Sequence, residues 1–304
     1  MINSITVINH RDERKTFVLA NPWSSGFAIT NIDGLGPVKA DVSTTDIASL
    51  DGAIFNSARS GKRNIVISCL FIENPTIEET RLESYRYFPI KKPITLQIET
   101  DIRTYTVKGY VESNTPAIFS SAEGCEISII CPESYFTALD ESGEFGGEVG
   151  SLQEFEFPFS NESLTSNLIE FSVATTQLVF EVLYGGRIET GLIFYLHVVD
   201  VLSSPSSIII EKVGTTDYMT LTPGTLPGGG FQAGDELVIC TIPGKKRITL
   251  IRSGESTNVT KILSRSSKWL KIEPGVNYFR VNTPLVDLGM FEIRFEYEPL
   301  YEGV

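Results

Sequence analysis

The chain has 304 residues, of which 41% are hydrophobic and 21% are charged, so we expect a packed globular protein of about two domains. No apolar run approaches the ~20 residues of a membrane-spanning helix, and the amino-terminal stretch lacks the apolar segment of a signal peptide. We therefore expect neither membrane insertion nor secretion. The net charge of −13 comes without a basic stripe, which argues against a nucleic-acid-binding surface.

Most of the negative charge lies in one connecting segment. Residues 133–162 contain eight acidic residues and no lysine or arginine, and the stretch from 142 to 150 has four glycines in nine residues. This composition is typical of a flexible linker. We predict a first domain over residues 1–135, an acidic glycine-rich linker over 136–150 and a second domain over 151–304.

The first unusual segment in chain order runs over residues 34–63. It is rich in glycine and aspartate, shows no clear amphipathic period and is longer than ordinary loops. Such a segment can reach a neighbouring copy of the chain, so we predict an arm or loop at an interface between copies. The candidate interface residues are Asp33, Gly34, Asp46, Asp51, Gly52, Gly61 and Arg63.

Strands follow this segment in the first domain. Asn64–Ile72 is apolar on both faces, as expected of a buried strand. Apolar residues alternate with polar ones in three later stretches, which predicts strands with one buried face. The inward residues are Ile94, Leu96 and Ile98 in the first stretch, Tyr105, Val107 and Val111 in the second, and Cys125, Ile127, Ile129 and Cys131 in the third.

One helix is predicted between these strands, at about 76–88. Its start is signalled twice, by Asn74-Pro75 as an N-cap followed by proline and by Thr76 with Glu79 as a capping box. The sequence does not choose between the two starts. We expect Leu82, Tyr85 and Phe88 to form the buried stripe and Pro89 to end the helix.

The second domain is predicted to be all-β. Short apolar or alternating runs recur between turn signals, which is typical of a sandwich. In the last run, apolar residues from Phe291 to Tyr297 alternate with charged ones. The predicted strands are Leu152–Phe159, Leu168–Val173, Leu178–Tyr184, Leu192–Val199, Ile208–Val213, Tyr218–Leu221, Leu237–Ile242, Arg247–Arg252, Val259–Leu263, Asn277–Val281 and Met290–Tyr297. The expected fold class is mainly β, with an α+β first domain.

Catalytic and metal-binding patterns are absent from the sequence. The four cysteines show no CxxC spacing, and we expect them to be buried, reduced thiols. His197 lies within an apolar run, which favours a half-buried side chain over a ligand or base. The acidic segment offers carboxylates of the kind used in glycoside hydrolysis, but a flexible linker holds catalytic geometry poorly. We predict no enzymatic activity, no metal and no cofactor.

Two further features concern ligands. Lys245-Lys246-Arg247 is the densest basic run, and its position beside Pro243-Gly244 predicts a solvated hairpin end. Trp269 is a candidate weak glycan contact, because carbohydrate sites favour exposed aromatic platforms, although a core position for this tryptophan is the competing interpretation.

The order and spacing of several short motifs resemble the phage distal tail protein family, a siphovirus-type tail component. In the first domain these motifs are Ile32-Asp33-Gly34, Thr45-Asp46, Asp51-Gly52-Ala53, Gly61 to Ile65, the helix with Arg81 and Tyr85 followed by Tyr87-Phe88-Pro89, Lys92-Pro93, Gly109 to Glu112 and Cys131-Pro132. In the second they are Gly234 to Ile239, Arg247–Leu250, Trp269-Leu270 and Pro274 to Asn277. Together they span nearly the whole chain.

The resemblance implies a virion structural protein at the tip of a long non-contractile tail, made in the host cytoplasm. The N-terminal domains would form a homohexameric ring around a channel through which DNA passes, and C-terminal galectin-like sandwiches would project outward. The implied partners are the tail tube and tape-measure end, the tail-associated lysin or fibre hub, and sometimes a receptor-binding protein. The acids of the linker would either line the channel or act as a solvated spacer. The alternative is a lectin-like tail or surface protein that contacts host glycans.

Overall fold

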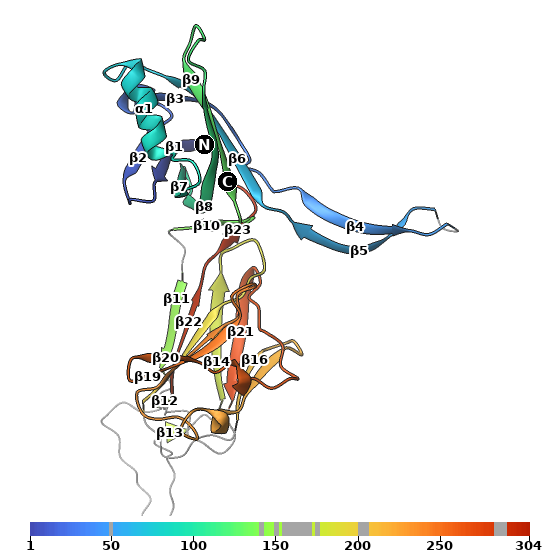
Figure 1. The fold of residues 1–304 in the computed structure, drawn as a ribbon. Coiled ribbons are helices and arrows are strands. Elements are labelled where there is room, and N and C mark those ends of the chain that lie inside the picture. Colours follow the sequence, from blue (N-terminus) through green and yellow to red (C-terminus); the bar gives the residue numbers. More distant parts are fainter. Residues whose placement is uncertain are drawn as a thin grey trace, which may run out of the picture. The chain divides into compact units, whose positions relative to one another are not determined.

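A computed structural model describes residues 1–48, 51–139, 143–148, 152–153, 172–173, 177–199, 207–282 and 291–304. The chain forms two compact units, Met1–Glu141 with Pro299–Val304 and Ser142–Glu298 (Figure 1). Strands account for 53% of the described residues and helical segments for 8%, so the predicted mainly-β class is confirmed.

The division of the chain differs from the predicted boundaries in two places. The predicted linker, 136–150, contains strand β10 (Phe136–Ala138) of the first unit and strand β11 (Gly143–Glu148) of the second. The last residues of the chain return to the first unit, where β23 (Leu300–Tyr301) pairs with β10. The physical reason is aromatic burial, since Phe136 and Tyr301 are 0% and 4% exposed within the first unit.

The first unit is built on one antiparallel sheet with the strand order β2-β1-β7-β8-β9-β6-β3. The bounds are β1 Ile2–Ile8, β2 Arg14–Val18, β3 Phe27–Asp33, β6 Arg63–Phe71, β7 Pro93–Thr100, β8 Thr104–Pro116 and β9 Gly124–Cys131, and a short 3-10 helix, η1, covers Pro22–Ser24. Strand β10 continues the sheet by pairing with β8. The predicted inward residues of β7 and β9 are buried, which confirms their alternation.

All four cysteines are buried and free, as the sequence predicts. Cys69 of β6 lies opposite Cys125 of β9 in the register, with their Sγ atoms 3.2 Å apart. Burial raises the pKa of the Cys131 thiol to about 11. These side chains therefore act as small apolar core residues in this unit.

Helix α1 (Ile77–Tyr87) begins after Thr76, whose Oγ1 accepts a hydrogen bond of 3.2 Å from the Glu79 amide. The capping-box start is therefore the correct one of the two that the sequence offered. No helix in the described part of the chain is long and apolar enough to cross a membrane.

The predicted buried stripe of α1 is wrong for two of its three residues. Leu82 and Tyr85 are 55% and 39% exposed, whereas Phe88, just after the helix, is buried. The helix instead buries Tyr87 at its end. It rests on the sheet through Thr80 and Ser84, one turn apart. Their small side chains allow a close approach, and their neighbourhood is polar: the Thr80 hydroxyl donates to the Ile72 carbonyl at 2.9 Å.

An arm projects from the sheet of the first unit (Figure 1). It consists of β4 (Ala40–Asp46) and β5 (Ala53–Ser60), which pair only with each other among the described strands. Every residue of both strands is exposed. A glycine at the base of the arm, Gly34, has a φ of 87° and lies so close to β6 that a Cβ there would overlap the Asn64 carbonyl.

The second unit is a β-sandwich around one core. Its sheets have the orders β11-β22-β15-β18-β19-β20 and β14-β21-β16-β17, and β12 pairs with β13. The bounds are β12 Leu152–Gln153, β13 Ser172–Val173, β14 Gln177–Tyr184, β15 Ile193–Val198, β16 Ile208–Lys212, β17 Tyr218–Leu221, β18 Glu236–Cys240, β19 Arg247–Arg252, β20 Glu255–Asn258, β21 Gly275–Asn282 and β22 Phe291–Tyr297, with 3-10 helices η2 Pro223–Thr225 and η3 Thr260–Ile262. Rings of Phe194, Phe279 and Phe295 from both sheets meet in the core.

Two predictions for this unit need comment. The predicted strand Val259–Leu263 is instead η3, because the buried residues Val259 and Ile262 are three apart, the period of a 3-10 turn rather than of a strand. Most of the predicted strands Leu152–Phe159 and Leu168–Val173 lies outside the described residues. The alternation predicted for β22 is confirmed, since its four apolar residues are buried.

An exposed ion pair ties α1 to the turn between β1 and β2. Arg86 Nη2 and Nε donate to the two carboxylate oxygens of Glu13 at 2.8 and 3.0 Å. Asn9 also donates to this carboxylate, at 2.9 Å. These bonds, with Arg86 as the larger cause, lower the pKa of Glu13 from 4.5 to about 2.

A left-handed backbone and a steric overlap should make Gly34 intolerant of a side chain. We expect Gly34→Ala to lower the free energy of unfolding by at least ~1–2 kcal/mol, measured by urea denaturation. Gly36→Ala is the matched control, because nothing lies within 4 Å of its Cβ position. Equal stability of the two variants would contradict the assigned geometry.

The lowered pKa of Glu13 should appear in the pH dependence of stability. The stabilisation is complete above the unfolded value of 4.5 and is lost as the pH falls to about 2, where the folded state also takes up the proton. We expect Glu13→Gln to lose less stability than the unsubstituted chain over this interval, measured by urea midpoints at successive pH values. Glu73→Gln, at an exposed position, should follow the unsubstituted chain.

Candidate assembly interface

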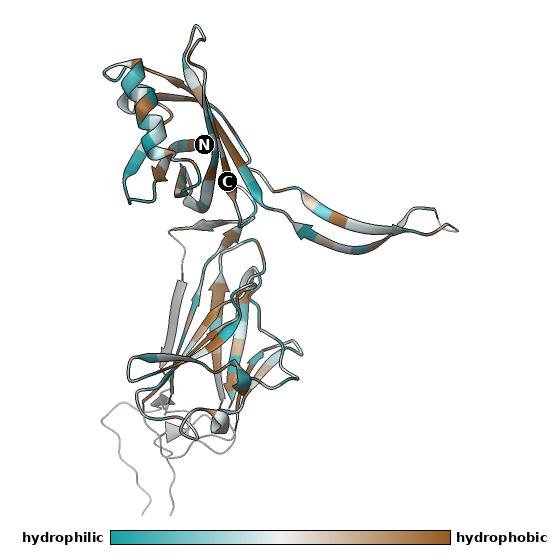
Figure 2. Ribbon diagram, in the orientation of Figure 1, coloured by the Kyte–Doolittle hydropathy of each residue, from teal (hydrophilic) through white to brown (hydrophobic). Residues whose placement is uncertain are grey.

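One side of the arm is apolar. Val42 and Phe55 are 58% and 63% exposed. The register pairs Val42 with Ala58 and Thr44 with Phe55, with a register shift between Ser43 and Thr44. Val42 and Thr44 are two apart on β4 and share a face. Figure 2 shows hydrophobic residues within both strands of the arm. An isolated two-stranded hairpin is only marginally stable in water, so a hairpin with exposed apolar residues gains stability when it packs against another protein surface.

Polar contacts across the arm involve other positions. Asp41 and Arg59 form an exposed ion pair of 3.5 Å, and the Asn56 side-chain amide donates to Thr45 Oγ1 at 2.7 Å. Exposed contacts of this kind contribute little to stability. They hold the register of the two strands while leaving the side of Val42 and Phe55 open.

Three of the predicted interface residues lie together at the outer end of the arm. Asp46 ends β4, and Asp51 and Gly52 immediately precede β5. All three are exposed, and Gly52 has a φ of 95°. The sequence thus identified the end of the arm from its turn residues. It missed the exposed apolar residues Val42, Ile54 and Phe55, which form no regular alternation because Ile54 and Phe55 are adjacent.

The other four predicted residues lie at the root of the arm. Asp33 is exposed and accepts a hydrogen bond of 3.1 Å from Asn31. The Gly61 carbonyl accepts one of 2.6 Å from the Ser134 hydroxyl. Gly34 is held close against β6, and Arg63 is only 1% exposed. We therefore assign Gly34 and Arg63 to the support of the arm, since neither offers a side chain to a neighbour.

Arg63 is the central residue of this root. Its guanidinium donates to the carbonyls of Gly34, Gly36, Ser134 and Glu302, with distances of 2.6 Å to Gly36 and 2.5 Å to Glu302. It also lies 4.2 Å from the centroid of the Phe136 ring. Burial lowers the pKa of Arg63, but an arginine stays charged in proteins. The carbonyls therefore compensate the buried charge and fix the base of the arm.

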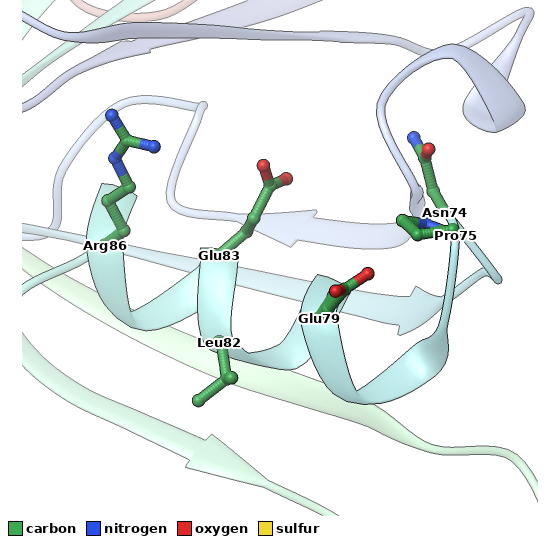
Figure 3. Close-up of a pocket in the computed structure, with 6 residues that line it drawn as sticks. All are labelled: Asn74, Pro75, Glu79, Leu82, Glu83 and Arg86. Carbon is green, nitrogen blue, oxygen red and sulfur yellow. The ribbon is translucent and has the colours of Figure 1, made fainter.

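A small hollow lies beside α1, with a volume of 360 Å³ and a lining of Asn74, Pro75, Glu79, Leu82, Glu83 and Arg86. Figure 3 shows Glu79, Glu83 and Arg86 on one side of the helix and Leu82 pointing away from them. Glu83 pairs with Lys15 at 2.7 Å, and Arg86 pairs with Glu13. These charges are engaged in holding α1 against the sheet.

The predicted glycan contact, Trp269, is partly buried and packs against the core of the second unit. Lys246 Nζ lies 6.0 Å from its ring centroid. His197 is likewise partly buried, on β15. Within the described ranges, no group of three or more histidine, cysteine, aspartate or glutamate side chains is placed to hold a metal ion.

Comparison with known proteins gives structural likeness without sequence likeness. No protein-family model and no curated protein matches the chain. The crystal structure of the SPP1 Dit protein, described as a paradigm of the hub adsorption apparatus in phages that infect Gram-positive bacteria, superposes with a TM-score of 0.60 at 11% identity, over 98% of this chain and 99% of that one.

Two structures of the phage p2 baseplate in its activated conformation also match. The one with Sr has a TM-score of 0.47 at 9% identity over 99% of both chains, and the one with Ca a TM-score of 0.45 at 9% identity over 100% of both. The SPP1 Dit structure, with its TM-score of 0.60, shows the fold of this chain. The chain has the fold of a phage distal tail hub protein over nearly its whole length.

Proposed function

We propose that the chain is a structural protein of a long non-contractile phage tail. Six copies form a ring at the distal end that joins the tail tube to the tail-tip apparatus. The fold shared with the SPP1 Dit protein supports the tail role. The observation that carries self-assembly is the arm, because its apolar side is exposed in the single chain.

A closed ring requires one patch of each copy to meet a different patch on the next. The arm is the first of these patches, with Val42 and Phe55 as its apolar contacts and Asp46, Asp51 and Gly52 at its end. The second patch lies on the neighbouring copy. Burying these two apolar side chains there supplies the stabilisation that the isolated hairpin lacks.

The proposed partners follow from this position in the tail. They are the tail tube and the end of the tape-measure protein on one side and the tail-associated lysin or fibre hub, with or without a receptor-binding protein, on the other. The proposed location is the tail tip of the virion, and DNA passes through the ring without being bound. The proposed role is structural rather than catalytic. Most of the acidic segment 140–162 lies outside the described residues. Its two predicted roles, lining the channel or acting as a solvated spacer, stay predictions.

A lectin-like role through Trp269 has weaker support. A sugar-stacking platform presents one face of its ring to solvent, whereas this ring packs on the core of its unit and lies near Lys246. Any glycan contact by this unit therefore needs another surface.

Introducing charge on the apolar side of the arm should prevent assembly. We expect the double variant Val42→Asp, Phe55→Asp to stay monomeric under conditions where the unsubstituted protein forms rings of six copies, because two carboxylates would have to be buried without partners. Light scattering gives the mass, and negative-stain microscopy shows the rings.

Ser256→Asp, on the exposed strand β20 of the second unit, is the control for an added surface charge. It should assemble like the unsubstituted chain. Unchanged assembly of the double variant would contradict the arm as the interface, and a monomeric unsubstituted protein would contradict ring formation by this chain alone.

The position of Trp269 gives a stability prediction. We expect Trp269→Ala to lower the free energy of unfolding by ~1–3 kcal/mol, because it removes a large ring that packs on the core. Trp23→Ala removes a tryptophan that is 70% exposed and should change stability by less than ~0.5 kcal/mol. Calorimetric unfolding of both variants measures the difference in stability loss. Equal losses in the two variants would contradict the assignment of Trp269 to the core.

A further inference from the structure

The second unit has a hollow on the outward side of its six-stranded sheet, separate from the arm. Its volume is 620 Å³. Strands β15, β18 and β22 and the turn between β18 and β19 supply its walls. This size is within the ~300–1,000 Å³ range of small-molecule sites.

The floor of the hollow is unusually apolar for a sheet surface. Ile193 pairs with Cys240 and Tyr195 with Val238 in the register of β15 and β18, and all four line the hollow. Their neighbours along these strands point into the core, so at these four positions the sheet is apolar on both sides, whereas the next outward pair, His197 and Glu236, is polar. An antiparallel sheet that faces water normally carries polar residues outward. The apolar floor therefore matches a ligand with an apolar face.

Polar groups in fixed positions border this floor on the side of β22. The Tyr195 hydroxyl donates to the Glu296 carboxylate at 2.6 Å, and the Arg294 guanidinium lies 4.3 Å from the Tyr195 ring centroid. Burial, with Glu296 as a further cause, raises the pKa of Tyr195 to about 12, so the hydroxyl stays a donor at neutral pH. The carboxylate is thereby held as an acceptor for ligand hydroxyl groups.

The opposite border is basic. Lys245, Lys246 and Arg247 line the hollow at the turn between β18 and β19, the hairpin end that the sequence predicted. The carboxylates in the lining are Glu296 and Glu298, so three positive groups face two negative ones. A locally positive hollow in a chain of net charge −13 favours an anionic ligand.

We propose that this hollow binds a saccharide that carries an acidic group, either phosphate or carboxylate. The carbon-hydrogen face of the sugar ring lies on the floor of Ile193 and Val238. Glu296 accepts from the sugar hydroxyls, and the acidic group lies against Lys246 and Arg247. The site does not depend on ring formation, so failure of the proposed assembly would leave it standing.

The test uses the full-length protein and measures binding by calorimetry and saturation-transfer NMR. The probes are glucuronic acid and glucose 6-phosphate. Glucose tests the sugar ring alone, inorganic phosphate tests the acidic group alone, and a hexaglutamate peptide represents acidic peptides as a competing class of ligand. We expect at least one acidic sugar to bind at least about tenfold more tightly than glucose or phosphate, because it alone uses both the floor and the basic border. Which of the two acidic sugars binds identifies the acidic group.

The variant is Lys246→Glu, Arg247→Glu, whose fold is checked by its thermal unfolding. We expect it to lose acidic-sugar binding by about tenfold or more. Lys261→Glu, at an exposed position outside the lining, should bind like the unsubstituted chain. The proposal is overturned if no acidic sugar binds, if glucose or phosphate alone binds as tightly, if the peptide binds more tightly, or if the folded double variant binds unchanged.

Discussion

The first unit depends on one buried cation. Arg63 begins β6, directly after the arm, and its guanidinium donates to carbonyls from three other stretches of the chain: 34–36, Ser134 and Glu302. A charge that is 1% exposed is tolerable only when hydrogen bonds surround it. The same bonds therefore force the segment before the arm, the loop before β10 and the end of the chain to meet at one point.

This constraint explains the contrast between the base of the arm and its length. At the base, Gly34 lies against β6 and Arg63 is enclosed by carbonyl groups. Beyond the base, every residue of β4 and β5 is exposed. The chain thus fixes the direction in which the arm leaves its sheet and leaves the residues of the arm open. For the proposed contact with another copy, a preorganised root would reduce the entropy lost on docking.

The sequence predicts what depends on local periodicity and misses what depends on tertiary contacts. The alternation in β7, β9 and β22 and the capping box of α1 are local signals, and they hold. The face that α1 buries is set by Thr80 and Ser84, which a hydrophobicity pattern does not select. Arg63 was predicted as an interface residue, whereas the structure buries it at the root of the arm, and its burial depends on a carbonyl 239 residues later in the chain. The arm was recognised by its turn residues and its length, whereas its apolar side required the register of β4 with β5.

The pairing of β10 with β23 gives the chain the topology of a frame with an insert. The chain leaves the first unit after one strand of this pair and returns at the other, and both Met1 and Val304 belong to the frame. The two ends of the insert are far apart in the gene but adjacent in the fold. Recombination at these two ends can therefore exchange the whole insert without interrupting the sheet that carries the arm. The proposed ligand site of the insert and the proposed assembly surface of the frame are then encoded by separable stretches of the gene. Lineages could diversify one while conserving the other.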